Sequence, residues 1–198
     1  QMFYLNDAFN GSMKNINFSS NANFNSMFQS ATKFDGNVSN WEMGLVSTTM
    51  DSMFEQADSF NQDIYTWNTS KVTTSSRMFF RADSFNGSMK DMDFFDDANF
   101  MNMFYGAAKF NGNVSNWKFG DSNSMAGMFE QADSFNRDLK RWNFSKTTST
   151  NRMFFGADVF NGSLVDADFS SNTDFSNMFY GATKFDGNVS NWKFGNSA

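Results

Sequence analysis

Residues 53–68 read MFEQADSFNQDIYTWN and residues 128–143 read MFEQADSFNRDLKRWN, so one motif occurs twice, 75 residues apart. Looser versions of it fill the chain. A Met-Phe pair begins eight times, at intervals of 25 residues except for one of 26: at Met2, Met27, Met53, Met78, Met103, Met128, Met153 and Met178. A fixed period of this length indicates a repeat array in which each copy packs on its neighbours. We number the copies one to eight from these pairs.

Each copy shows two hydrophobic patterns. Apolar residues at −3, 0, +1 and +4 relative to the Met have the spacing of one face of a short helix. After a repeated Phe, an Asn or Asp predicts a turn, which does not require glycine because Gln62 and Arg137 replace the usual Gly. Apolar columns then follow with the L-x-x-L-x-L spacing of a leucine-rich-repeat strand. All five Trp residues share one of these columns, which favours a stacked core over a ligand cage.

These patterns predict an α/β fold. We expect a right-handed, leucine-rich-repeat-like solenoid of eight coils, each with a short helix or helical turn and a short strand in a parallel sheet. It would form a single domain over residues 1–198 and be a fragment of a longer array. Copies one, four and seven resemble one another, as do two, five and eight, and three and six, so surface features would recur every three coils, roughly every 14 Å.

Composition excludes several classes of function. The chain has no Cys and no His, which removes the usual thiolate nucleophile, general base and transition-metal ligands. A formal charge of −6 with only 15 basic residues argues against nucleic acid as a partner. The sequence has no apolar stretch of membrane-spanning length, so we expect no membrane insertion. We also expect no catalytic residues, no cofactor and no metal.

The motif M-F-x-x-A-x-x-F-N-x-D-[IL]-x-x-W-N resembles that of the BspA-like leucine-rich-repeat surface proteins, over essentially the whole chain. The resemblance implies an α/β solenoid at the cell surface or secreted, with a role in adhesion to host or matrix molecules. Between the Trp and the next Met-Phe, only residues 68–73, NTSKVT, come close to the family's usual segment. A partner shared with the family is therefore not implied.

If the Trp column points inward on a strand, the residues on either side of it point outward. In leucine-rich-repeat proteins this sheet face is the usual binding surface. We call these residues the Trp-flanking face: Asn15, Asn17, Asn40, Glu42, Thr66, Asn68, Asp91, Asp93, Asn116, Lys118, Arg141, Asn143, Asp166, Asp168, Asn191 and Lys193. An alternative is that Asp93 and Lys118, and Asp168 and Lys193, merely neutralise each other along an exposed sheet.

Two further columns are candidate sites. The position after Met-Phe would make an outward aromatic stripe, suited to association or to sugar stacking unless neighbouring loops cover it: Tyr4, Phe80, Tyr105, Phe155 and Tyr180. The Asn or Asp after the repeated Phe could bind calcium or a glycan. An internal ladder of Asn hydrogen bonds to the turn backbone explains that column more simply.

We therefore expect a non-enzymatic adhesion or structural module at the cell surface or secreted, acting by multivalent contacts with a protein or the extracellular matrix. The alternative is a polysaccharide- or ice-binding protein that uses a regularly spaced polar face, although charged residues on that face count against ice. Self-association end to end is a further hypothesis.

Overall fold

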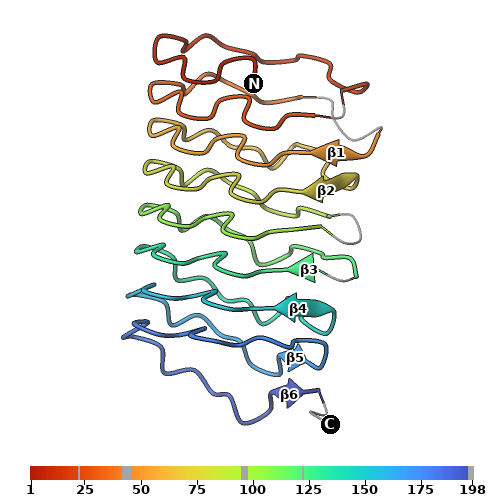
Figure 1. Ribbon diagram of the computed structural model, residues 1–198, viewed down its shortest axis with the longest axis vertical. Coiled ribbons are helices and arrows are strands. Elements are labelled where there is room, and N and C mark those ends of the chain that lie inside the picture. The colour runs from red at the N-terminus through yellow and green to blue at the C-terminus, as the bar shows by residue number, and fades with distance from the viewer. Residues whose placement is uncertain (22, 42–45, 95–97, 122, 196–198) are drawn as a thin grey trace.

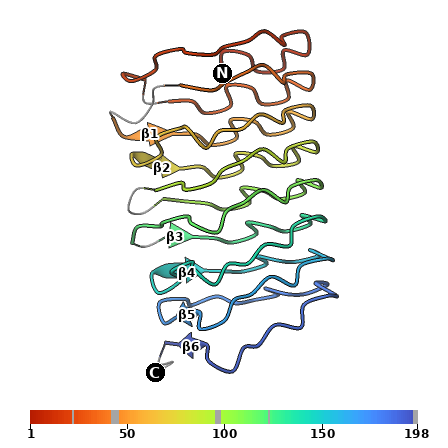
Figure 2. The same ribbon diagram turned by 180° about the vertical axis from the view of Figure 1, so that it is seen from behind.

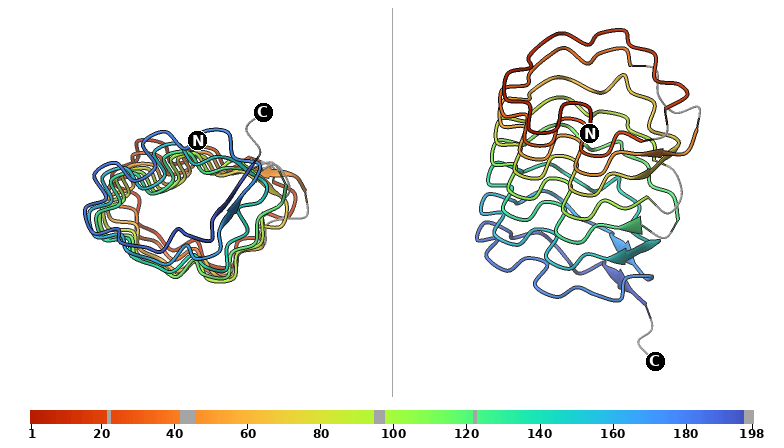
Figure 3. Two further views of the ribbon diagram at one scale, coloured as in Figure 1. Left: turned by 90° about the horizontal axis from the view of Figure 1, so that it is seen from below. Right: turned by 45° about the horizontal axis from the view of Figure 1, so that its top comes forward.

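The chain winds in coils that stack along its long axis, with the first and the last described residues at opposite ends of the stack (Figures 1 and 2). This computed structural model describes residues 1–21, 23–41, 46–94, 98–121 and 123–195. Viewed along the stack, each coil is a flattened ring (Figure 3). One repeat makes one coil, so equivalent residues of successive copies lie side by side.

The strands are short and parallel. β1 (Thr48–Thr49) pairs with β2 (Val72–Thr74), β3 (Asn123–Ser124) with β4 (Thr147–Ser149), and β5 (Asp168–Phe169) with β6 (Lys193–Phe194). Isolated bridges join the first two pairs into one ladder, four residues before each Met-Phe, that crosses seven copies. Its members are Asn23, Thr49, Thr74, Asn99, Ser124, Ser149 and Asp174. β5 and β6 lie elsewhere in the coil, directly after the Trp column.

The predicted α/β fold class is wrong, because no residue in the described ranges is helical. The described chain accordingly offers no helix long and apolar enough to cross a membrane. The Met-Phe segment is instead a run of tight turns. Residues at −1 and +3 from the Met have left-handed backbone, for example Ser26 and Ser30, with φ of 55° and 58°. A right-handed helix cannot continue through such residues.

Hydrogen bonds in copy two show what replaces the helix. The Met27 N–H closes a turn on the Phe24 carbonyl at 3.1 Å, and the Phe28 N–H donates to the Met53 carbonyl of the next copy at 2.9 Å. Backbone donors therefore alternate between the local turn and the neighbouring coil. The apolar spacing of −3, 0, +1 and +4 fits successive turns as well as a helical face.

The predicted strand position is also wrong. The residue before the Trp lies in a turn in every copy. Around the Trp column, the described β-pairing between coils involves the residues after it, as in the bridge from Asp93 to Lys118 and the β5–β6 pair. Most pairing lies instead in the ladder before Met-Phe. The strand spacing expected of a leucine-rich repeat thus marks a turn followed by an inward Trp.

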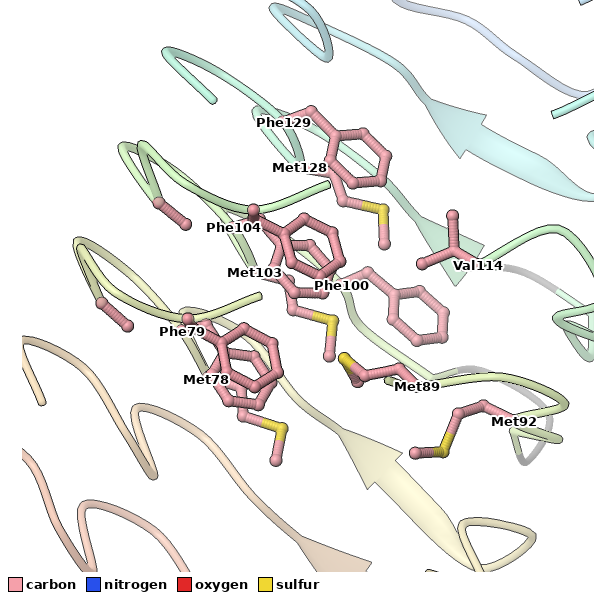
Figure 4. Packing of buried hydrophobic residues seen from close by; sticks show 14 of the residues in the cluster. Met78, Phe79, Met89, Met92, Phe100, Met103, Phe104, Val114, Met128 and Phe129 are labelled. Atoms are coloured by element: carbon pink, nitrogen blue, oxygen red, sulfur yellow. The ribbon is translucent and has the colours of Figure 1, made fainter. Parts of the chain in front are cut away.

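Two columns of stacked Phe run through the core. The Phe of Met-Phe stacks on its equivalent in the next copy with ring centroids 5.3–5.7 Å apart. The repeated Phe six residues later stacks likewise at 5.6–5.8 Å. Figure 4 shows Phe79, Phe104 and Phe129 in three successive copies, each beside its preceding Met. Such a core needs neighbours above and below, so the coils stabilise one another.

The prediction that the Trp residues pack in the core is confirmed. Trp41, Trp67, Trp117 and Trp142 are at most 5% exposed, and Trp192 is partly buried. In all five, the indole Nε1–H donates to a carbonyl in the first apolar column of the preceding copy, at 2.6–3.0 Å. Trp therefore supplies both packing and a bond between coils.

The hydrogen bonds of the predicted Asn ladder are confirmed, but the ladder lies at the surface of the stack and is not internal as expected. In copies one to seven, the Asn or Asp after the repeated Phe accepts, through Oδ1, a hydrogen bond from the backbone N–H of its equivalent in the next copy. The seven bonds measure 2.7–3.1 Å and run through Asn10, Asp35, Asn61, Asn86, Asn111, Asn136, Asn161 and Asp186. Because Asn and Asp share this oxygen, they interchange freely in the column.

Candidate binding faces

Every described residue of the Trp-flanking face is exposed or half-exposed, while the residues between them are buried or half-buried. Glu42 lies outside the described residues. The exposure expected on either side of the Trp column is therefore present, although a turn and not a strand precedes each Trp. Asn15, Asn40, Asp91 and Asp166 in those turns have left-handed backbone with φ of 60–63°, a conformation that Asn and Asp adopt more readily than most residues.

Five residues of this face form a connected group, which we call the first polar cluster: Asp91, Asp93, Asn116, Lys118 and Arg141. Arg141 Nη1 donates to Asn116 Oδ1 at 2.9 Å, and Asn116 Nδ2 donates to Asp91 Oδ1 at 2.8 Å. Lys118 Nζ lies 3.9 Å from Asp93 Oδ2. The hydrogen bond from Asn116, aided by Lys90, holds the pKa of Asp91 below its usual value.

Four members of this cluster recur 75 residues later as the second polar cluster: Asp166, Asp168, Asn191 and Lys193. Asn191 Nδ2 donates to Asp166 Oδ1 at 3.0 Å, and Lys193 Nζ lies 3.9 Å from Asp168 Oδ2. The structure thus places both predicted charge pairs within ion-pair distance. These pairs are exposed, and such pairs contribute little to folding stability.

The first polar cluster lines an open depression of about 530 Å³ together with Trp117. Two carboxylates, one amide and two cations there can accept and donate hydrogen bonds to a polar partner. A mixed-sign surface of this kind suits recognition of another polar surface better than binding of an apolar ligand.

The aromatic stripe is not continuous. Phe80 stacks on Tyr105 with ring centroids 4.6 Å apart, and Phe155 stacks on Tyr180 at 4.9 Å. Tyr4 is 44% exposed in copy one. Gln29, Glu55 and Glu130 occupy the same column in copies two, three and six, and so separate the aromatic residues into two pairs and a single Tyr.

Two buried glutamates lie in this column and were not predicted from the sequence. The side chains of Glu55 and Glu130 are only 7% and 6% exposed, and each binds an Arg of the next copy through both carboxylate oxygens. One sequence pattern could have indicated these ion pairs. The segment F-E-Q-A occurs in copies three and six, and in each case R-M-F-F opens the next copy. Burial raises the pKa of Glu55, but the hydrogen bonds from Arg77 and Ser52 outweigh it and hold the pKa below its usual value.

Each of these Arg side chains also covers an aromatic ring. The Arg77 guanidinium carbon lies 3.9 Å from the centroid of Phe80, and that of Arg152 lies 3.7 Å from the centroid of Phe155. The arrangement Glu–Arg–Phe–Tyr thus occurs twice, at equivalent places three copies apart.

The calcium hypothesis gains no support from the described residues, in which no group of three or more carboxylates is placed to hold a metal ion. The acidic residues that do approach one another share one column, in adjacent copies or, for Asp7 and Asp58, two copies apart. Burial, with repulsion from Asp83 and Asp7, raises the pKa of Asp58, and burial with repulsion from Asp158 raises that of Asp133.

Comparison with known proteins places the repeat in a family. The model of the family described as "Mycoplasma protein of unknown function, DUF285" matches residues 1–109 and again 96–192, which together cover nearly the whole chain. No curated protein and no solved structure matches the chain.

Proposed function

We propose that this chain, which belongs to the repeat family described as Mycoplasma protein of unknown function, DUF285, is a non-enzymatic adhesion or structural module that contacts a protein or matrix partner at several equivalent places. Its location would be the cell surface or the extracellular space. The motif's resemblance to the BspA-like surface proteins supports this location.

The observation that carries the proposal is the duplication of the polar cluster. Asp91, Asp93, Asn116 and Lys118 recur with the same bonding 75 residues later, and core packing does not require this, because the side chains are exposed or half-exposed. Two equivalent sites on one rigid stack can bind a repetitive partner together. Linked sites of this kind raise the overall affinity well above that of either alone.

A polysaccharide is the second candidate partner, and the partly exposed aromatic pairs favour it. Phe80 with Tyr105 and Phe155 with Tyr180 offer planar rings at the surface. Ice is disfavoured as a target, since the Trp-flanking face carries charges of both signs.

The test is binding to arrayed matrix proteins by three variants of the chain. The first carries D91S, D93S, K118S and R141S, the second carries D166S, D168S, N191S and K193S, and the third combines both sets. We expect each single-cluster variant to bind at least about ten-fold more weakly, and the combined variant to lose binding, because avidity requires both clusters.

A matched control carries K109S and D83S, two exposed residues of opposite charge away from the polar clusters. This variant keeps the net charge, as the first cluster variant does, and should bind like the wild type. Full binding by the combined variant would refute the proposal.

A further inference from the structure

The structure has a second open depression, of about 580 Å³, that shares no lining residue with the first polar cluster. We call it the Tyr105 depression. Tyr105 lines it from copy five, Gly127 and Glu130 from copy six, and Arg152 and Asn151 from copy seven. Its volume lies within the range of roughly 300–1,000 Å³ that is usual for small-molecule sites.

Small residues of copy six leave this space open. Gly127 has a left-handed backbone with φ of 61°, and a Cβ there would lie 2.1 Å from Asn102 Oδ1. Arg152 and Asn102 occupy the same position in the neighbouring copies. A side chain at position 127 would therefore displace Asn102, which also lines the depression.

Tyr105 offers an aromatic ring to the depression. Phe80 stacks on Tyr105 from copy four at 4.6 Å and takes no part in the lining. The next member of the column toward the C-terminus is Glu130 in place of another aromatic residue. Phe80 therefore packs against Tyr105 from the side of copy four, and the depression lies on the side of copy six.

The polar groups around this ring are held in place. Glu130 binds Arg152 through both carboxylate oxygens, and Arg152 packs over Phe155 with 39% of its side chain exposed. A guanidinium has five N–H donors, and this ion pair uses two of them. Asn102, Asn151 and the Asp174 carboxylate add amide donors and oxygen acceptors to the lining.

This chemistry selects among classes of ligand. The paired Glu130 and Arg152 cancel in charge, which leaves the Asp174 carboxylate to repel polyanions. An apolar ligand would strip water from the amides and the guanidinium without replacing their hydrogen bonds. A neutral pyranose ring suits both the aromatic ring and the polar lining. The partly positive C–H bonds of one of its faces pack on the negative face of an aromatic ring, and its hydroxyls donate and accept hydrogen bonds.

We propose that the Tyr105 depression binds a pyranose residue of a neutral glycan, stacked on Tyr105 and hydrogen-bonded by Arg152, Asn102 and Asn151. This site is separate from the polar clusters and stands whether or not those clusters bind a partner.

The chain contains its own comparison site. Glu55 and Arg77 repeat the ion pair three copies earlier, but Gln29 stands there in place of Tyr105, and Ser52 in place of Gly127. Without the aromatic ring and the open space, that place should not bind sugar. Tyr105→Gln therefore introduces a residue that the same column already carries.

The test uses the full chain on an array of neutral oligosaccharides of glucose, galactose, mannose and N-acetylglucosamine, printed both free and attached to a carrier protein. The strongest ligand is then titrated by calorimetry. We expect Y105Q to weaken binding at least about ten-fold through loss of stacking, and Y105F to retain most of it. Binding to both printed forms would indicate the sugar itself as the target. Binding to the carrier-linked form alone, if Y105Q weakens it, would indicate a glycoprotein glycan.

Tyr65→Gln is the matched control, since it removes an exposed Tyr that lies outside the Tyr105 depression and outside the aromatic stripe, and it should leave sugar binding unchanged. Thermal melting shows whether each variant is folded. Equal binding by folded Y105Q and wild type, or no binding to any neutral glycan, would each overturn the proposal. The polar-cluster variants should bind sugar normally, so failure here and failure of the proposed adhesion are distinguishable.

Discussion

At the scale of single residues, the Asn ladder shows how one oxygen atom joins neighbouring coils. Asn111 Oδ1 accepts a hydrogen bond from the Asn136 backbone N–H at 3.1 Å. The Asn111 backbone N–H in turn donates to Asn86 Oδ1 at 2.9 Å. The column contains only Asn and Asp because both place an acceptor oxygen at the same distance from the backbone. This preference needs no bound ligand to explain it.

Asn111 tests this explanation. Asn111→Ala leaves the Asn136 N–H without its acceptor, and we expect a loss of about 1 kcal/mol in the free energy of unfolding. Asn111→Asp keeps the oxygen and should cost much less. Urea denaturation of both variants measures the difference, and equal destabilisation by Asp and Ala would contradict the role of Oδ1.

At the scale of the element, left-handed residues decide that the Met-Phe segment forms turns. Position +3 carries Gly in copies five, seven and eight, as Gly106, Gly156 and Gly181, all with positive φ. The residues at −1 and +3 in the other copies, such as Ser26 and Gln131, adopt the same backbone at a cost in conformational energy. Bonds to the neighbouring coil offset that cost.

Gly156 and Gly162 are needed for two different reasons, the first for its backbone conformation and the second for the close approach of adjacent coils. A Cβ on Gly156, where φ is 64°, would have its nearest neighbour, Gln131 Cγ, at 3.5 Å, so Gly156→Ala tests conformation alone. A Cβ on Gly162 would lie 2.0 Å from the Arg137 carbonyl oxygen of the preceding copy. That glycine allows adjacent coils to approach.

We expect Gly156→Ala to cost about 1 kcal/mol, the penalty for a left-handed residue with a Cβ. Gly162→Ala should cost more than about 2 kcal/mol, because a backbone atom cannot move aside without separating the coils. Denaturant unfolding of the two variants gives both values. A smaller effect at Gly162 than at Gly156 would show that the coils are free to move apart there.

At the scale of the whole molecule, the three-copy period organises both core and surface. Trp occurs in copies two, three, five, six and eight, and the polar clusters and the Glu–Arg–Phe–Tyr arrangement recur with the same period. In copies one, four and seven, Phe18, Phe94 and Phe169 pack edge-on against the Trp of the next copy, at 4.8–5.0 Å. The unit of three coils is therefore a structural module.

Deletion of residues 78–152 removes one such module and joins Arg77 to Met153, which recreates the native Arg-Met-Phe-Phe junction. We expect the shortened chain to fold with a lower denaturation midpoint and an m-value reduced by roughly 40%, because less surface is buried. Circular dichroism with denaturant measures both. Deletion of residues 78–140 puts the later copies half a coil out of register and should prevent folding. Loss of structure in the in-register deletion would contradict independent three-coil modules.

The sequence by itself determined the repeat period, the inward Phe and Trp columns, the Asn ladder and the exposure of the residues beside each Trp. These features follow from the equivalence of the copies, since a column that is apolar in nearly every copy is buried only if it faces the interior of the stack. The columns of the candidate sites, Tyr105 and Lys118 among them, could be identified for the same reason.

Only the tertiary structure decided the conformation of each coil. The spacing of Phe24, Met27, Phe28 and Ala31 is the same in a helix and in successive turns, and the choice depends on whether backbone donors bond within the segment or to the next coil. The Tyr105 depression and the buried Glu55 and Glu130 likewise combine side chains from two or three copies. The contacts between coils are set by the distance at which the Phe columns stack, and a linear pattern does not contain that distance.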